Sequence, residues 1–271
     1  MRYWLFACLV TTVLPLAATE EQPVSTRLLW GDTHLHTSNS FDVYLFGTIG
    51  STPDTAYRFA RGLPVVSPTT GVRRQLETPL DFLVVSDHAE LIGSIPRLYA
   101  GDREISDTVS GRALLAVSSD RTEKQLQYVY NQIALLGSGL PAEIDLTAQQ
   151  VLEDLHAGEK RRTTWDETIE AAERHNEPGV FSALIGWEWS AQPRGGNLHR
   201  VVFMSQGAEV GRQFLPYSAL ESVDPRDLWD WLDRTSRLTG ADFVAIPHNP
   251  NLSMGLFFPT STLTGLSLIH I

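Results

Sequence analysis

Two histidines separated by a single residue follow an apolar run near the start of the chain. They are His34 and His36, in the stretch Leu-Trp-Gly-Asp-Thr-His-Leu-His-Thr. Side chains two positions apart on a β-strand point to the same face, so both imidazoles can reach one metal ion. Because a lone His-x-His pair is often a coincidence, its meaning depends on further ligands elsewhere in the chain.

Four further residues with metal-binding side chains lie next to other apolar runs. His88, Glu188 and His248 each follow such a run, and His199 precedes one in a glycine-containing loop. Neutral imidazoles combined with a carboxylate suit Zn²⁺, Mn²⁺ or Fe²⁺, and the two oxygens of Glu188 could bridge two ions. Such ions lower the pKa of bound water to about 7 and polarise the group under attack. The residues therefore predict metal-assisted hydrolysis.

The elements that must position these side chains alternate between strands and helices. Strands are predicted at residues 28–35, 81–86, 180–187, 200–204 and 243–246. Helices are predicted at residues 53–61, 164–175 and 224–239, the first from the pair Thr52-Pro53 and the second from a capping-box pattern at Thr164. This alternation is typical of an α/β protein with a βα (TIM-like) barrel, whose site lies at the C-terminal ends of the strands.

Residues 93–162 interrupt this alternation. They show helical patterning at 120–136 and 148–155 but no strand of comparable strength. A chain of 271 residues that is 42% hydrophobic can bury one substantial core. We therefore expect a single catalytic domain over residues 28–258, with residues 93–162 forming a helical insertion or lid.

The first residues of the chain have the pattern of an export signal. Arg2 precedes an apolar stretch that ends in small residues at Ala17 and Ala18. We expect a signal peptide over residues 1–19, a linker over 20–27, and a periplasmic or secreted protein without a stable membrane anchor after cleavage. The net charge of -11 disfavours nucleic acid as the main partner. The oligomeric state does not follow from the sequence.

Taken together, the motifs resemble those of a known superfamily. His34-Leu35-His36, Ser86-Asp87-His88, Gly186-Trp187-Glu188 and Pro247-His248-Asn249 resemble, in this order, metal-binding motifs of the polymerase-and-histidinol-phosphatase (PHP) superfamily of phosphoesterases. The longer sequence motifs around His36 and His88, together with Asn197-Leu198-His199-Arg200, resemble those of the exported branch called domain-of-unknown-function family 3604. The resemblance covers roughly residues 28–258.

This resemblance implies a distorted, PHP-type βα barrel with two or three divalent metal ions, zinc, manganese or iron. It implies that His34, His36, Glu188 and His248 are ligands, and that His88 and His199 bind a second or third ion. The substrate would be a small phosphorylated molecule.

Three other residues receive weaker assignments. Asp42 lies six residues beyond His36, where related proteins often place a further ligand, although a simple turn carboxylate is an equal alternative. Asp87 is expected to orient a neighbouring imidazole rather than to bind metal. Arg200 directly follows His199 and could clamp a substrate phosphate, because guanidinium groups suit such oxyanions.

One departure from the superfamily leaves other functions open. The usual late Asp-x-His motif is missing before Ile271, so we expect a C-terminally truncated fragment, an incomplete barrel and a tail over residues 259–271 that need not be native. A metal-binding module without catalysis is therefore one alternative to a phosphoesterase. An amidohydrolase-like hydrolase of C–N or C–O bonds is another, although Lys124 and Lys160 both lie in the insertion, away from any strand end.

Overall fold

The structure is a computed structural model that describes residues 27–257. The expected signal peptide over residues 1–19, nearly all of the expected linker over 20–27 and the tail over 259–271 lie outside the described residues. Among the residues described, no helix has both the length and the apolar character that crossing a membrane requires.

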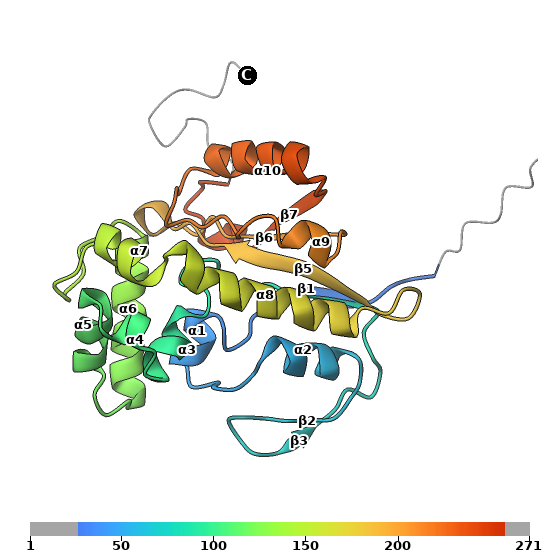
Figure 1. Ribbon diagram of the computed structural model, residues 1–271, viewed down its shortest axis with the longest axis horizontal. Coiled ribbons are helices and arrows are strands. Elements are labelled where there is room, and N and C mark those ends of the chain that lie inside the picture. Colours follow the sequence, from blue (N-terminus) through green and yellow to red (C-terminus); the bar gives the residue numbers. More distant parts are fainter. Residues whose placement is uncertain (1–26, 258–271) are drawn as a thin grey trace, which may run out of the picture.

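One sheet forms the centre of the described chain (Figure 1). Within residues 27–257 it has five strands, in the spatial order β1, β4, β5, β6 and β7. Their bounds are Gly31–Leu35, Phe82–Val85, Ser182–Trp189, Arg200–Met204 and Phe243–Pro247. Strands β1, β4 and β5 are parallel, whereas β6 runs antiparallel to both β5 and β7. A separate hairpin pairs β2 (Val65–Val66) with β3 (Arg73–Arg74).

The prediction of a TIM-like βα barrel, complete or incomplete, is wrong. The sheet is open, curled and mixed, and helices do not surround it in the described part of the chain. The connection between β5 and β6 explains the difference, because it spans only residues 190–199 and contains a short 3₁₀ turn at Pro193–Gly195. A parallel neighbour needs a crossover of a dozen or more residues, so β6 returns antiparallel.

The two reversals of direction bring the expected ligands to one edge of the sheet. Strand β7 is antiparallel to β6 and therefore runs in the same direction as β5. The N-terminal end of β6, next to His199, thus lies beside the C-terminal ends of β5 and β7. The backbone N–H of His248 donates to the carbonyl of His199 over 3.3 Å, which joins the two ends directly.

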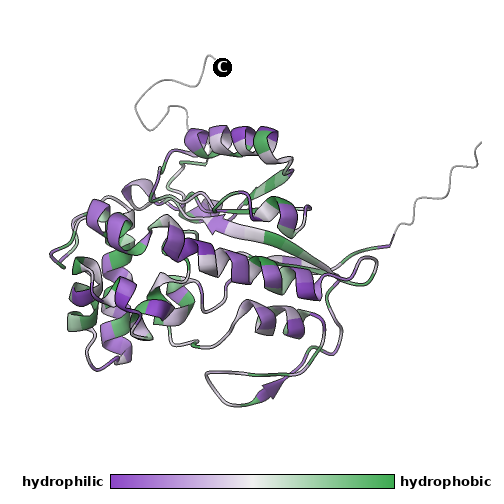
Figure 2. Ribbon diagram, viewed as in Figure 1, coloured by the Kyte–Doolittle hydropathy of each residue, from purple (hydrophilic) through white to green (hydrophobic). Residues whose placement is uncertain are grey.

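Helices cover one face of the sheet. They are α2 (Pro53–Ala60), α8 (Gly158–His175), α9 (Ala208–Gly211) and α10 (Pro225–Thr239). Helix α8 runs alongside β5 and alternates hydrophilic and hydrophobic residues, as a covering helix does (Figures 1 and 2). The ring of Trp187 on β5 meets Trp165 of α8 and Trp231 of α10 edge to face, each at 5.9 Å between centroids. Trp187 is therefore a core residue, and its neighbour Glu188 points to the opposite face.

The start of α8 differs from the prediction. The capping-box pattern at Thr164 predicted a helix beginning there, but α8 begins at Gly158. Thr164 lies inside the helix, buried, with its side chain packed against the backbone at Gly93. Gly93 has a φ of 72°, and a Cβ at that position would collide with the Thr164 hydroxyl. The threonine therefore serves packing between the helix and a loop rather than capping.

The remaining helices form a second apolar cluster at one end of the sheet, on the left in Figure 1. They are α1 (Phe41–Leu45), α3 (Ser94–Tyr99), α4 (Arg103–Ser106), α5 (Val109–Val117), α6 (Glu123–Gly137) and α7 (Ala148–Leu155). Helix α6 opens with a reciprocal capping box between Thr122 and Gln125. All but α1 come from residues 93–162, so this segment contributes its own helical layer beside the sheet edge that carries the histidines. A 3₁₀ turn at Pro250–Leu252 follows β7.

His156 attaches this helical layer to the loop after β4. It lies at the C-terminal end of α7, is 4% exposed, and its Nδ1 accepts the backbone N–H of Leu91. Burial, with a smaller contribution from the positive charge of Arg161, lowers the pKa of His156 to about 2. The side chain is therefore neutral in the folded protein at any physiological pH.

We expect the replacement His156→Asn to make the fold less sensitive to acid. Unfolded His156 takes up a proton below a pKa of about 6.5, whereas the folded side chain does not, so the unfolded state binds more protons and stability falls as the pH falls. Between pH 7 and pH 5 this loss amounts to about 2 kcal/mol. The asparagine oxygen can still accept the Leu91 N–H without titrating.

Chemical denaturation at both pH values measures this difference. All other titratable groups are the same in both proteins, so their contribution cancels in the comparison. The free energy of unfolding should fall by about 2 kcal/mol less in the variant than in the original protein. Equal losses of unfolding free energy in the two proteins would contradict the conclusion that His156 stays neutral in the folded state.

Candidate metal centre

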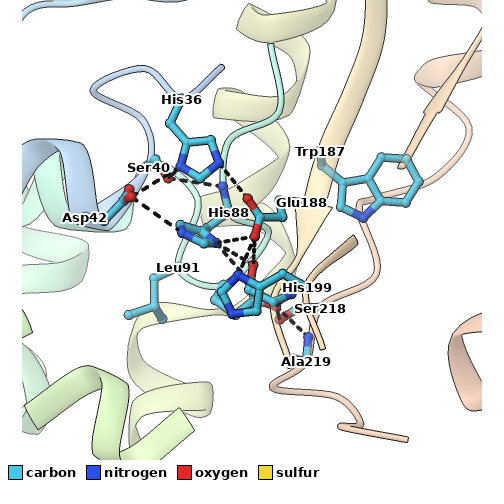
Figure 3. Close-up of polar contacts among 12 residues, drawn as sticks. His36, Ser40, Asp42, His88, Leu91, Trp187, Glu188, His199, Ser218 and Ala219 are labelled. Carbon is cyan, nitrogen blue, oxygen red and sulfur yellow. Dashed lines mark hydrogen bonds and ion pairs between the residues drawn. The ribbon is translucent and has the colours of Figure 1, made fainter. Parts of the chain in front are cut away.

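Glu188 lies at the centre of a cluster of five histidines. Figure 3 labels Glu188 with three of them, His36, His88 and His199. The Glu188 side chain is fully buried at the end of β5. One carboxylate oxygen, Oε2, lies 2.9 Å from Nε2 of His34 and 2.6 Å from Nε2 of His36. His34 on β1 and His36 just after it therefore both contact Glu188 of β5 through this one oxygen.

The other oxygen of Glu188 faces a different set of side chains. Oε1 lies 2.6 Å from Nδ1 of His199, 3.3 Å from Nε2 of His248 and 3.8 Å from Nδ1 of His88. The hydroxyl of Ser190 also donates to Oε1 over 3.2 Å. The carboxylate thus separates two groups of imidazoles, one at each oxygen.

Local backbone features bring these residues into place. The pairing of β1 with β4 shifts between Asp32 and Leu35, and such a bulge re-aims the side chains around it. The carboxylate of Asp32 accepts the backbone N–H of His34 over 2.8 Å and holds this turn of the strand. His88 forms an isolated parallel bridge with Glu188, and the N–H of Ala89 donates to the Glu188 carbonyl.

Asp42 forms a third group with two of the same histidines. It lies in α1, and its Oδ2 is 3.2 Å from Nδ1 of His36 and 3.6 Å from Nε2 of His88. The hydroxyl of Ser40, at the start of α1, accepts the backbone N–H of His88. His36 therefore faces Glu188 with one ring nitrogen and Asp42 with the other.

The ion-pair partners of Asp42 and Glu188 are imidazoles. Burial alone would raise the pKa of Glu188, but the surrounding imidazoles hold it well below its usual range. Burial opposes protonation of His36, yet Asp42 and Glu188 raise its pKa to about 10. Within residues 27–257, no arginine or lysine forms an ion pair with Asp42, Glu90 or Glu188. Among the described residues, direct ion pairs to these carboxylates thus come from histidine alone.

The donor set fits divalent metal ions. Three combinations bring ligand atoms within 4.8 Å of one another: His34 with His36 and Glu188, His36 with Asp42 and His88, and His88 with Glu188 and His199. Two ligands of a tetrahedral ion lie about 3.4 Å apart, close to the spacings within the cluster. In addition, Oδ1 of Asp42, Oε2 of Glu90 and Nδ1 of His248 are buried without a hydrogen-bond partner. These groups could hold a metal.

Three residues around the cluster, Glu90, Ser190 and Gln192, were not expected from the sequence. Glu90 is buried, and its Oε1 accepts the N–H groups of Ser190 and Ala219 and the hydroxyl of Ser218. Ser190 hydrogen-bonds Nδ1 of His88, and the amide of Gln192 lies 3.0 Å from Nε2 of His199. Glu90 follows His88 by two positions, the same spacing as His34 and His36, and that spacing could have identified it.

Asp87 lies beside the cluster without touching an imidazole. Its carboxylate accepts both the backbone N–H and the hydroxyl of Thr37, and it is almost fully buried. Because Thr37 directly follows His36, Asp87 fixes the backbone beside a ligand rather than the ring of a ligand. The structure therefore does not bring it into the orienting contact that the sequence suggested.

Arg200 faces away from the cluster. It lies on β6 between the rings of Trp189, Trp229 and Phe257, with its guanidinium carbon 5.0–5.5 Å from the three centroids. One guanidinium nitrogen donates to the carbonyl of Leu198, and burial lowers its pKa to about 10. Adjacent residues of a strand point to opposite faces, so His199 and Arg200 cannot both face Glu188.

Comparison with known proteins assigns a family but no activity. Searches of curated proteins and of solved structures found no match. A family model described as "Protein of unknown function (DUF3604)" matches residues 23–269, which includes every residue of the cluster. The chain therefore belongs to the DUF3604 family.

Proposed function

We propose that this protein is a metal-dependent hydrolase that cleaves a phosphate ester of a small phosphorylated molecule. The observation that carries the proposal is the division of Glu188 between two imidazole groups, with His34 and His36 at one oxygen and His199 and His248 at the other. A carboxylate in this position suits a bridge between two ions, and paired ions suit in-line displacement at phosphorus.

Two ligand groups follow from these contacts. His34, His36 and Glu188 would hold one ion, and His88, His199 and Glu188 the other, with His248 beside the second. Imidazole and carboxylate ligands suit zinc, manganese or iron. When bound, such ions lower the pKa of water to about 7 and polarise the ester oxygen.

The surrounding residues orient the ligands. Asp42 hydrogen-bonds Nδ1 of His36, which leaves Nε2 of that ring toward Glu188. Gln192 contacts Nε2 of His199 and leaves Nδ1 toward Glu188. Such outer contacts fix the tautomer and the direction of a ligating imidazole. We therefore assign Asp42 to orientation, with a third ion at Asp42, His36 and His88 as the alternative.

Two sequence features add support. The order of the motifs resembles the PHP superfamily, and membership in it is part of this proposal. The amidohydrolase alternative needs a carboxylated lysine at the metals, but Lys124 is exposed on α6 and Lys160 donates to the carbonyl of Asp154 in the insertion.

From the pattern of residues 1–19 we also propose that the protein is exported to the periplasm or secreted.

The variant Glu188→Gln should lose metal. The amide keeps the size of the side chain but removes the charge that both groups share, so affinity should fall by more than the roughly 10–100-fold expected for an outer contact. Elemental analysis after equilibration with limiting metal measures the ions per chain. Glu167→Gln, an exposed glutamate on α8, is the matched control and should load normally. Unchanged metal content in Glu188→Gln would refute the assignment.

The variant Asp42→Asn separates orientation from ligation. If Asp42 only orients His36, metal affinity should fall about 10–100-fold while the number of ions bound at saturation stays the same. Titration with metal, followed by elemental analysis, gives both quantities. One ion fewer per chain at saturation would instead make Asp42 a ligand of a third ion.

Hydrolysis assays test the function itself. The metal-loaded protein should hydrolyse a generic aryl phosphate, lose this activity with a chelator and regain it with zinc or manganese. Glu188→Gln should be inactive under the same conditions, and Glu167→Gln active. Turnover of carboxylic esters or amides but not phosphates would favour the amidohydrolase alternative. Full metal loading without any turnover would make the protein a non-catalytic metal-binding module.

A further inference from the structure

A cavity of about 60 Å³ lies directly beside the second ligand group. Its polar wall includes His88 and His199, which are also members of that group, and Glu90. Another part of its wall comes from helices α6 and α7 and includes Ile133, Ala134 and Val151. A molecule held at His88 and His199 would therefore extend one substituent toward the helical layer.

The lining of the cavity determines what that substituent can be. Most of it is apolar, with the rings of Phe41 and Tyr130 beside aliphatic side chains. None of the lining residues, all of them within the described chain, is an arginine or lysine, and the one acidic side chain among them is Glu90. That carboxylate repels an anionic substituent. Its Oε2 is buried without a hydrogen-bond partner, so a probe that carries an ammonium group must be included in the test.

The volume limits the size of the substituent. An apolar cavity of about 150 Å³ can hold benzene, so a cavity less than half that size accommodates about two to four carbon atoms. Aromatic bases and sugars are too large for it. A short alkyl chain or a small branched alkyl group fits both the volume and the apolar wall.

We propose that this cavity binds a compact, uncharged alkyl substituent of the substrate and that Ala134 sets its length. This refines the proposed function by naming the class of group next to the scissile phosphate, and it rests on that function for the phosphate part alone. It also gives the helices of residues 93–162 a role in substrate selection, because they form part of the cavity wall.

Binding to the metal-loaded protein tests the proposal without requiring turnover. The probes are methylphosphonate, propylphosphonate and two analogues of similar length, 2-aminoethylphosphonate and 2-carboxyethylphosphonate. Affinity measured by calorimetry should rise about 4-fold for each methylene buried between methyl and propyl. Both charged analogues should bind more weakly than propylphosphonate. Equal affinities for methylphosphonate and propylphosphonate would overturn the proposal, and so would tighter binding of either charged analogue.

A pair of leucine variants locates the effect. Ala134→Leu should fill the cavity and reduce the ratio of propylphosphonate affinity to methylphosphonate affinity to about one. Ala116→Leu places the same side chain at an exposed position of α5 and should keep the original preference. Unfolding temperatures confirm that both variants are folded. An unaltered preference in Ala134→Leu would place the alkyl group elsewhere and refute the proposal.

Probes with a different metal-binding head group test the cavity independently of the proposed phosphoesterase activity. Acetohydroxamate and butyrohydroxamate bind metals through a different group but differ by the same two methylenes. If only the hydroxamates bind and the longer one binds more tightly, the cavity proposal stands and the phosphoesterase assignment fails. If neither series depends on chain length, the cavity proposal fails, whatever the hydrolysis assays show.

Discussion

The fully buried carboxylate of Glu188 is the constraint on which the rest of this site depends. An ionised carboxylate removed from water costs several kcal/mol unless charges and hydrogen bonds compensate. The chain compensates it with imidazoles from four different segments of sequence and with the hydroxyl of Ser190. Because imidazole is only weakly basic, this compensation alone depends on pH, whereas divalent ions would supply it at any pH where the ligands are deprotonated.

The direction of the strands decides which side chains can reach Glu188. Strand β5 carries it at its C-terminal end, where β1 and β4 also end. The short return into β6 then places His199 before its strand rather than after it, and β7 reverses again to end beside them. The same antiparallel return that makes the sheet unlike a TIM barrel therefore completes the ligand set. A parallel β6 would have carried His199 to the opposite edge.

Sequence patterns predict the strands and the ligands better than they predict the connections and the supporting contacts. Apolar runs locate the strands because burial selects for them, and the Thr52-Pro53 start of α2 is read correctly from its capping chemistry. The expected ligands converge because each lies next to a strand end at one edge. The contacts of Asp87 with Thr37 and of Arg200 with three aromatic rings depend on segments far apart in sequence, and no local spacing encodes them. Thr164 has the local pattern of a helix cap, but tertiary packing against Gly93 overrides it.

The surroundings of Arg200 change how an anionic substrate must be recognised. A desolvated guanidinium between aromatic rings gains about 2 kcal/mol from cation–π attraction, which favours keeping it there over turning it toward a ligand. If the substrate is a phosphate ester, as proposed, attraction for it would then come from the metal ions themselves. Two divalent ions carry four positive charges against the three carboxylates of Asp42, Glu90 and Glu188, which leaves the loaded site with net positive charge. Under the proposed function, phosphate affinity would therefore be coupled to metal loading, and the apolar wall of α6 and α7 would add selectivity without adding charge.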